Sequence, residues 1–279
     1  MSVYDYSTDD NREESLQAAV EAVQSGQLIV VPTDTVYGIG ADAFNADAVQ
    51  ALLDAKGRGR NVPPPVLIGD AGVLHALGVD IPPIAEDLAD EYWPGALTLI
   101  VKAQPSLMWD LGESRGTVAL RMPNHEGTLA LLKKTGPLAV SSANKHGRDA
   151  ATSIVDAATQ LGDRVEVYLD AGPSPIGESS TIIDATVEPV AILRPGAITE
   201  EEIVAKFGPI FTPEPEPEPE PELEAESEQQ PESEAEVAPD SVTEADAEAA
   251  PNDGEAPEAD AAPAVEQAEA PAPQAEGRA

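Results

Sequence analysis

Two hydrophobic patterns alternate along most of the chain. In the first, apolar residues recur every three or four positions, which predicts a helix with one buried face. Residues 13–25 show this spacing: Leu16, Ala19 and Val23 share one face, and Gly26 follows as a residue that can end a helix. The pattern predicts helices over residues 13–25, 46–55, 84–92, 128–134, 154–161 and 200–207, the last with Thr199 as its N-cap.

The second pattern consists of short apolar runs, some uninterrupted and some alternating with polar residues, and it predicts strands. The run at residues 28–31 ends at Pro32, which lacks a backbone donor and therefore leaves the sheet. Further strands are predicted over residues 65–68, 97–101, 117–120, 137–140, 165–169, 181–183 and 190–193. Because helices and strands alternate without an internal repeat, we expect a single α/β (α+β) domain with a twisted, mixed, open sheet flanked by helices.

Both patterns end near Thr212. Residues 212–279 contain 22 acidic residues, one basic residue, 12 prolines and no aromatic residue. Such a composition cannot bury enough apolar surface to offset the entropy lost on ordering, so we expect a disordered acidic tail. The sequence therefore predicts a folded domain over residues 1–211, with its core at about 13–208, followed by a tail over residues 212–279.

Charge changes this picture, because the cations of an acidic chain gather in a few loops. The formal net charge is −37 overall, and residues 1–211 hold 14 Lys and Arg against 30 Asp and Glu. Seven of these 14 cations lie in or beside predicted loops: Lys56, Arg58, Arg60, Arg121, Lys145, Arg148 and Arg194. Cations next to Ser, Thr and Asn on an acidic body indicate a pocket for a small anion such as a nucleotide, and argue against a surface for a large polyanion.

Other classes are excluded by what the sequence lacks. There is no cysteine, which excludes disulfides and thiolate metal sites. The three histidines do not have the spacing of a metal site. No stretch approaches the roughly 18 apolar residues of a membrane span, and the first residues are polar, so we expect a soluble, cytoplasmic protein without membrane contact.

Two polar segments are candidates for ligand binding. Residues 32–40 follow a predicted buried strand, which places Thr35 and its neighbours at a sheet edge where open α/β sheets bind ligands. An ordinary tight turn capped by Asp34 is the alternative. Residues 56–60 hold three cations in five positions. One or two of them could complement a helix dipole, but three indicate a phosphate clamp.

Strand ends carry the other candidates. Arg121 ends an apolar run and needs an anionic partner there, which could be a ligand, or Asp170 or Asp184. Arg194 follows another apolar run in the same way, and residues 141–144 place small hydroxyl and amide groups after a strand. Groups of this kind suit a phosphate or ribose, although they are also common in turns.

Taken together, these motifs resemble the YrdC-like family of threonylcarbamoyl-AMP synthases, over about residues 15–208. The resemblance is carried, in the order of the family, by residues 32–38, 56–58, 93–98, 117–123, 141–144, 177–181 and 193–196. It implies a YrdC-like fold with a concave cationic cavity. It also implies a nucleotidyltransferase that converts L-threonine, bicarbonate and ATP to threonylcarbamoyl-AMP and pyrophosphate. This is the first step in forming N6-threonylcarbamoyladenosine in tRNAs that read codons beginning with A.

The resemblance also implies roles for individual residues. Thr35, Arg121 and Ser180 correspond to threonine-binding positions. Lys56 and Arg58 correspond to catalytic ligands of the ATP phosphates. The rest of the ATP site corresponds to Thr117, Ser142, Asn144 and Arg194. A Mg²⁺ ion would bind through the ATP phosphates, with no protein ligand assigned. Proteins that transfer the threonylcarbamoyl group to tRNA would act downstream, and contact with tRNA or double-stranded RNA is a further expectation.

The sequence departs from the family pattern at three positions. Leu67 stands where a threonine-contacting histidine can occur, and Val62 and Ala150 stand where polar nucleotide contacts can occur. Two alternatives to a synthase remain: a paralogue of the same fold without synthase activity, and a module that binds double-stranded RNA or tRNA. The net charge of −37 argues against strong non-specific binding to nucleic-acid phosphates.

Overall fold

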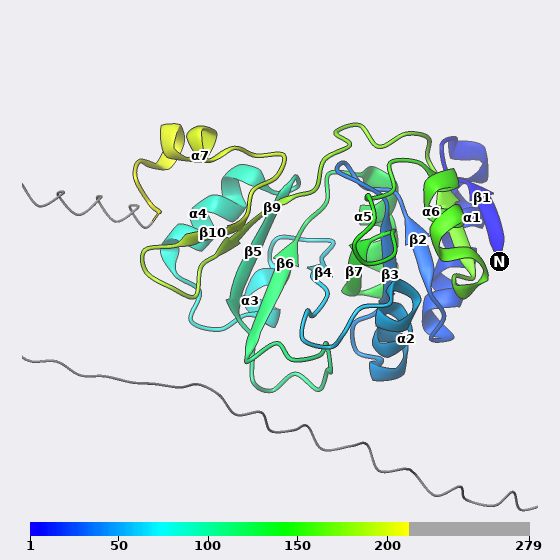
Figure 1. Cartoon of the computed structure of the whole chain (residues 1–279), viewed down its shortest axis with the longest axis horizontal. Helices are drawn as coiled ribbons and strands as arrows, with labels where there is room; N and C mark the ends of the chain where they lie inside the picture. The colour runs from blue at the N-terminus through cyan, green and yellow to red at the C-terminus, as the bar shows by residue number, and fades with distance from the viewer. Residues whose placement is uncertain (212–279) are drawn as a thin grey trace, which may run out of the picture. The chain divides into compact units, whose positions relative to one another are not determined.

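The computed structural model describes residues 1–211, and the tail predicted over residues 212–279 lies outside this range. The described part forms one mixed sheet with helices packed against it (Figure 1). Its ten strands lie in the order β1-β8-β2-β3-β7-β4-β6-β5-β9-β10. Their bounds are β1 Ser2–Asp5, β2 Ile29–Val31, β3 Gly38–Asp42, β4 Val66–Leu67, β5 Leu97–Lys102, β6 Thr117–Arg121, β7 Leu138–Ser142, β8 Val167–Asp170, β9 Thr181–Asp184 and β10 Ala191–Arg194.

Parallel and antiparallel pairs both occur, which confirms the expected mixed sheet. Strands β1 and β2 each pair with β8 in parallel. The pairs β4·β6 and β5·β9 are also parallel. The pairs β2·β3, β3·β7, β4·β7, β5·β6 and β9·β10 are antiparallel.

All six predicted helices are present. Helix α7 begins directly after Thr199, whose side chain accepts a hydrogen bond from the Glu202 N–H and completes a capping box. A short helix, α3, precedes α4. The helices are α1 Asp9–Gln24, α2 Ala46–Lys56, α3 Val73–Leu77, α4 Pro83–Tyr92, α5 Glu126–Thr135, α6 Ile154–Leu161 and α7 Glu200–Phe207, with a 3₁₀ turn at Gly162–Arg164.

The sequence pattern did not predict two of the strands, β3 and β1. The polar segment expected to be a loop over residues 32–40 turns into strand β3 at Gly38, which pairs with Ser142 of β7. A Cβ at Gly38 would lie 2.5 Å from Val140 Cγ1, so this position needs a glycine. Because glycine has a low propensity for strands, the sequence pattern did not predict β3. Strand β1 lies at an edge of the sheet and is largely exposed, and therefore lacks an apolar run.

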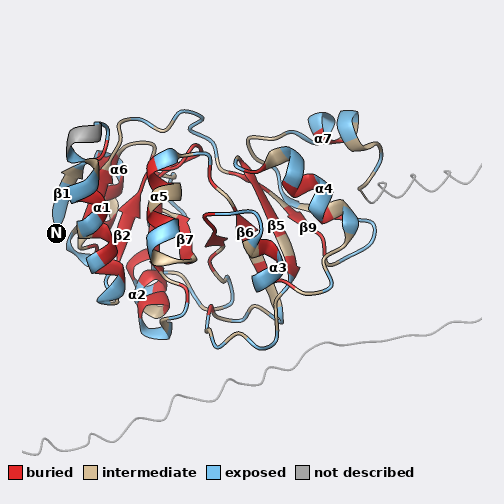
Figure 2. Cartoon of the chain, turned by 180° about the vertical axis from the view of Figure 1, so that it is seen from behind, coloured by how far each residue is buried: buried red, intermediate tan, exposed pale blue. Residues whose placement is uncertain are grey.

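The helices cover the two halves of the sheet differently. In the half that contains β2, β3, β7 and β8, helices α1 and α5 pack on one face, and α2 and α6 pack on the other. In the other half, α3 and α4 lie over one face of β5, β6 and β9 (Figure 2). Side chains on the opposite face of those strands are therefore free to line a cavity.

Candidate functional site

A cavity of about 350 Å³ lies on the face of β5 and β6 opposite α3 and α4. Strand alternation produces it, because successive side chains point to opposite faces of a sheet. Leu97, Leu99 and Val101 enter the core, whereas Thr98 and Ile100 between them line the cavity. The volume falls within the roughly 300–1,000 Å³ of small-molecule sites.

The charge of the cavity wall is opposite to that of the domain. Three guanidinium groups line it, from Arg58, Arg121 and Arg194, and among the described residues no Asp or Glu lines it. Several serine and threonine residues, including Thr35 and Ser180, also line it. A wall of cations and hydroxyl groups favours an anionic ligand with many hydrogen-bond acceptors.

Arg121 is buried at the end of β6 and bound on three sides. Its Nε donates to the Gly95 carbonyl at 2.9 Å, and Nη1 donates to Thr35 Oγ1 at 2.7 Å. Its Nη2 donates to Asp34 Oδ1 at 2.6 Å, and both side chains of this ion pair are only 8% exposed. Burial lowers the pKa of Arg121, while the neighbouring Asp34 carboxylate opposes that effect.

The partner of Arg121 differs from the two carboxylates considered from the sequence. Asp34 supplies the charge, and its Oδ1 also accepts the Asn124 N–H at 2.9 Å. Asp170 instead accepts the Gly172 N–H, and Asp184 accepts from Thr186. Neither Asp170 nor Asp184 contacts Arg121, because both cap turns at the ends of their own strands.

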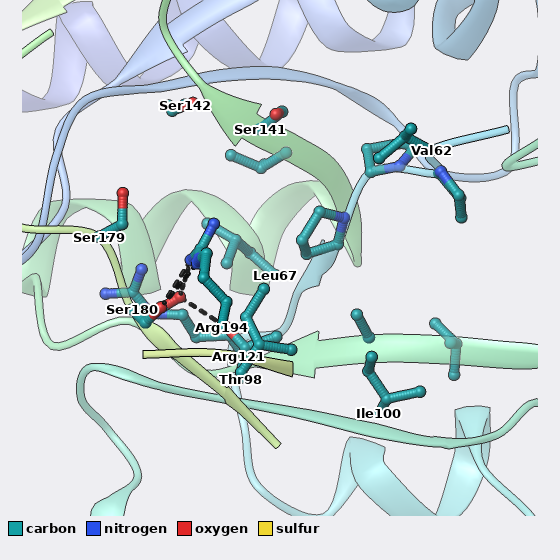
Figure 3. Close-up of a pocket in the computed structure, with 18 of the residues that line it drawn as sticks. Val62, Leu67, Thr98, Ile100, Arg121, Ser141, Ser142, Ser179, Ser180 and Arg194 are labelled. Atoms are coloured by element: carbon teal, nitrogen blue, oxygen red, sulfur yellow. Dashed lines mark hydrogen bonds between the residues drawn. The ribbon is translucent and has the colours of Figure 1, made fainter. Parts of the chain in front are cut away.

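Ser180 connects Arg194 to strand β5 (Figure 3). Arg194 donates to the Ser180 carbonyl from Nε at 3.2 Å and from Nη2 at 2.6 Å, and Nη2 also approaches Ser180 Oγ at 3.1 Å. On its other side, Ser180 Oγ lies 2.8 Å from Thr98 Oγ1. The Ser180 hydroxyl is therefore held between a cation and a second hydroxyl.

Arg58 reaches the cavity because α2 ends at Lys56 and the cap residue Gly57 adopts the left-handed conformation (φ 64°). Its Nη1 donates to Ser141 Oγ at 3.0 Å. Burial, and then the charge of Arg194, lower the pKa of Arg58. Two guanidinium groups that repel each other in this way would be stabilised by an anion between them.

Lys56 and Asn144 lie behind the cavity wall. The Lys56 ammonium donates to the carbonyl oxygens of Ser142 and Asn144, the latter at 2.7 Å, and to Asn144 Oδ1 at 3.5 Å. An ammonium has three N–H donors, so these bonds account for all of them. Burial, and then Arg58, lower the pKa of Lys56 to about 8. Lys56 therefore shapes the cavity by holding the end of β7.

The structure thus brings together most of the residues singled out from the sequence. Seven of them line the cavity: Thr35, Arg58, Thr117, Arg121, Ser142, Ser180 and Arg194. Leu67 and Val62 also line it, whereas Ala150 does not. Sequence reasoning missed Thr98 as a site residue, although its place between Leu97 and Leu99 in an apolar strand was a signal.

Residues 1–211 contain no group of three or more His, Asp or Glu side chains that could hold a metal ion. Among the helices in the same range, none has the length and apolar character needed to cross a bilayer.

The mixed sheet and its carboxylate-free, arginine-lined cavity define an α/β protein with a site suited to a small anion. Comparison with known families makes this more specific: a family model described as telomere recombination, Sua5/YciO/YrdC, matches residues 21–196. The chain belongs to the Sua5/YciO/YrdC family.

Several relatives carry the same name. A Mycobacterium tuberculosis protein provisionally named threonylcarbamoyl-AMP synthase is 49% identical over 205 residues, covering 74% of this chain and 94% of its own. The threonylcarbamoyl-AMP synthase of Bacillus subtilis is 40% identical over 194 residues, covering 69% of this chain and 56% of its own. The chain therefore spans little more than half the length of the Bacillus relative.

Solved structures confirm the fold. Pyrococcus abyssi Sua5 complexed with L-threonine matches with a TM-score of 0.72 at 34% identity, covering 76% of this chain and 62% of that one. Escherichia coli YciO matches with a TM-score of 0.64 at 23% identity, which supports the fold alone. Both matches agree with the YrdC-like α/β fold expected from the sequence.

Proposed function

We propose that this protein is a threonylcarbamoyl-AMP synthase, a nucleotidyltransferase that converts L-threonine, bicarbonate and ATP to threonylcarbamoyl-AMP and pyrophosphate. The observation that carries the proposal is the cavity in which Arg58, Arg121 and Arg194 meet without a carboxylate on the wall. The names of the Bacillus and Pyrococcus relatives, and the L-threonine in the Pyrococcus complex, support the same activity.

The reaction consists of two displacements. The threonine amine attacks the bicarbonate carbon, and water leaves as the carbamate forms. A carbamate oxygen then bonds to the α-phosphorus of ATP, and the bond from that phosphorus to the bridging oxygen breaks and releases pyrophosphate. Three reactants that each carry an anionic group must be held in contact, so positioning and charge neutralisation supply most of the rate acceleration.

We assign the threonine carboxylate to the end of the cavity near Arg121. Three of the five N–H groups of this guanidinium are bound to Gly95, Thr35 and Asp34, which leaves two N–H groups without a partner among residues 1–211. One of these lies on each Nη, so a carboxylate can accept from both nitrogens. Thr35 and Ser180 complete the threonine site in this proposal.

The nucleotide then occupies the end near Arg58 and Arg194, whose mutual repulsion an ATP phosphate would relieve. Thr117 and Ser142 line the same cavity and offer hydroxyl groups to the nucleotide. Lys56 supports this end by holding the β7 terminus, and phosphate contact would require it to give up one of its three present acceptors. We therefore assign Lys56 to the ATP site as a residue that acts mainly through Ser142 and Asn144.

A resident metal ion does not fit these residues, because no carboxylate of the described chain lines the cavity. Mg²⁺ would instead arrive with ATP as part of the substrate, bound by phosphates and water. The product would pass to proteins that transfer the threonylcarbamoyl group to tRNA, and we propose that the enzyme acts in the cytoplasm. In this proposal residues 1–211 are the catalytic domain and residues 212–279 are dispensable for turnover.

Pyrophosphate release tests the proposal. The full-length protein should release pyrophosphate from ATP only when L-threonine and bicarbonate are both present, and mass spectrometry should detect threonylcarbamoyl-AMP. Release that is independent of L-threonine would overturn the proposal. Filter binding of tRNA over a salt series would identify the alternative RNA-binding module, which should bind RNA without releasing pyrophosphate.

A further inference from the structure

We infer that Thr98 is a positioning residue, whose hydroxyl holds the Ser180 hydroxyl in the orientation that binds the substrate carboxylate. The identity of that substrate rests on the proposed function. The positioning itself rests on the contact between the two hydroxyl oxygens, which lie 2.8 Å apart on the cavity wall.

Packing alone does not account for a threonine at this position. Thr98 is 1% exposed and lies in a strand whose other buried members, Leu97, Leu99 and Val101, are apolar. A valine would occupy nearly the same volume, whereas a hydroxyl buried without a hydrogen bond would destabilise the fold. Ser180 is the one hydrogen-bond partner of the Thr98 hydroxyl within residues 1–211. Within this range the Thr98 hydroxyl can therefore affect the structure only through its hydrogen bond with Ser180.

The hydroxyls of Thr98 and Ser180 together keep one O–H donor for a ligand. Ser180 Oγ already accepts from Arg194 Nη2, and one of the two hydroxyls must donate to the other. Two hydroxyls carry two protons, so one proton of the pair remains unused in either arrangement. Because Thr98 and Ser180 both line the cavity, this remaining O–H can donate to a ligand there.

The neighbouring groups are donors as well. Arg194 lies against Ser180, and Arg121 keeps two N–H groups without a partner in the described chain. The charged groups at this end are both cations, which favours a carboxylate over an ammonium there. Thr98 contributes by preventing the Ser180 hydroxyl from rotating away from this arrangement.

Kinetics of Thr98→Val and Thr98→Ser test the inference. Thr98→Val removes the hydroxyl but keeps the shape, so the KM for L-threonine should rise by roughly three- to tenfold, as expected for one hydrogen bond. The KM for ATP should change less than twofold. Thr98→Ser keeps the hydroxyl and should restore the KM for L-threonine. Equal KM values for L-threonine in Thr98→Val and wild type would overturn the inference, as would a Thr98→Ser variant as impaired as Thr98→Val.

A double-mutant cycle separates positioning from packing. In a Ser180→Ala background there is no hydroxyl to orient, so adding Thr98→Val should change the KM for L-threonine less than twofold. The same factor in both backgrounds would show that Thr98 acts independently of Ser180. Thr186→Val is a matched control, because it removes a hydroxyl bound to Asp184 away from the cavity and should leave this KM unchanged.

A structural readout keeps this inference separate from the proposed function. If the wild-type protein shows no L-threonine-dependent pyrophosphate release, the proposed function fails. Crystal structures of wild type and Thr98→Val still decide the positioning. Ser180 should adopt one side-chain rotamer in wild type and more than one in the variant. A single, unchanged Ser180 rotamer in Thr98→Val would overturn the inference.

Discussion

Removing the Arg121 guanidinium should destabilise the fold as well as the site. Asp34 and Arg121 form an ion pair in which both side chains are 8% exposed, and Arg121 also binds Thr35 and Gly95. Arg121→Met keeps an apolar stem in place but leaves Asp34 as a buried carboxylate without its cation. The Asn124 N–H is then the one remaining donor to the Asp34 carboxylate within the described chain.

The expected magnitude follows from burial. Breaking a buried pair by removing one partner costs about 3–5 kcal/mol, because the remaining charge is uncompensated. For a domain of this size, 1 kcal/mol corresponds to roughly 2–4 °C in melting temperature. Arg121→Met should therefore lower the melting temperature by about 6–20 °C.

Adding Asp34→Asn should recover more than half of this loss. The substitution removes the unpaired charge, and the amide oxygen can still accept the Asn124 N–H. Arg60→Met provides a matched control, because Arg60 pairs with Asp110 at the surface, with side chains 41% and 50% exposed. An exposed pair contributes about 1 kcal/mol or less.

Thermal and urea denaturation of the four proteins measure these differences, and calorimetry measures ligand binding. The double variant should fold, lose L-threonine affinity and retain most of its ATP affinity. An Arg121→Met protein that melts within about 2 °C of wild type would refute the estimate of the buried pair. A double variant no more stable than Arg121→Met would show that the unpaired Asp34 charge is not the cause.

Three further predictions concern the other cations and one glycine. Because the pKa of Lys56 is lowered to about 8, its ammonium loses a proton and one donor as pH rises through that value. The kcat/KM for ATP should therefore fall above about pH 8 in wild type and remain level in Lys56→Arg, and parallel profiles would contradict this. Arg58→Ala should lower the rate of pyrophosphate release about a hundredfold. The melting temperature should change little, because the substitution removes a single hydrogen bond, to Ser141. A release rate near that of wild type would show that Arg58 is not part of the site. Gly196→Ala should lower the melting temperature by several degrees, because its Cβ would lie 2.6 Å from the Ser180 carbonyl carbon; an unchanged melting curve would show that the backbone can yield.

Local regularities of the sequence determined much of the fold. Helices α6 and α7 have the predicted bounds, because each combines one apolar face with a side chain that caps its first turn. Most strand positions followed from apolar runs, because the spacing of apolar residues indicates which side chains are buried. Strands β1 and β3 were missed because one is an exposed edge and the other relies on glycines for close approach to β7.

For the site too, the sequence determined some features and the tertiary structure decided others. Clustered cations on an acidic chain predicted an anion-binding cavity, because charge composition does not depend on how the strands are ordered. The pairing of Arg121 with Asp34 joins residues 87 positions apart, and the contact of Thr98 with Ser180 joins residues 82 apart. Sheet order alone brings these groups together. Tertiary structure likewise decided that Lys56 binds the end of β7, because the direction of a long side chain depends on which acceptors lie nearest to it in space.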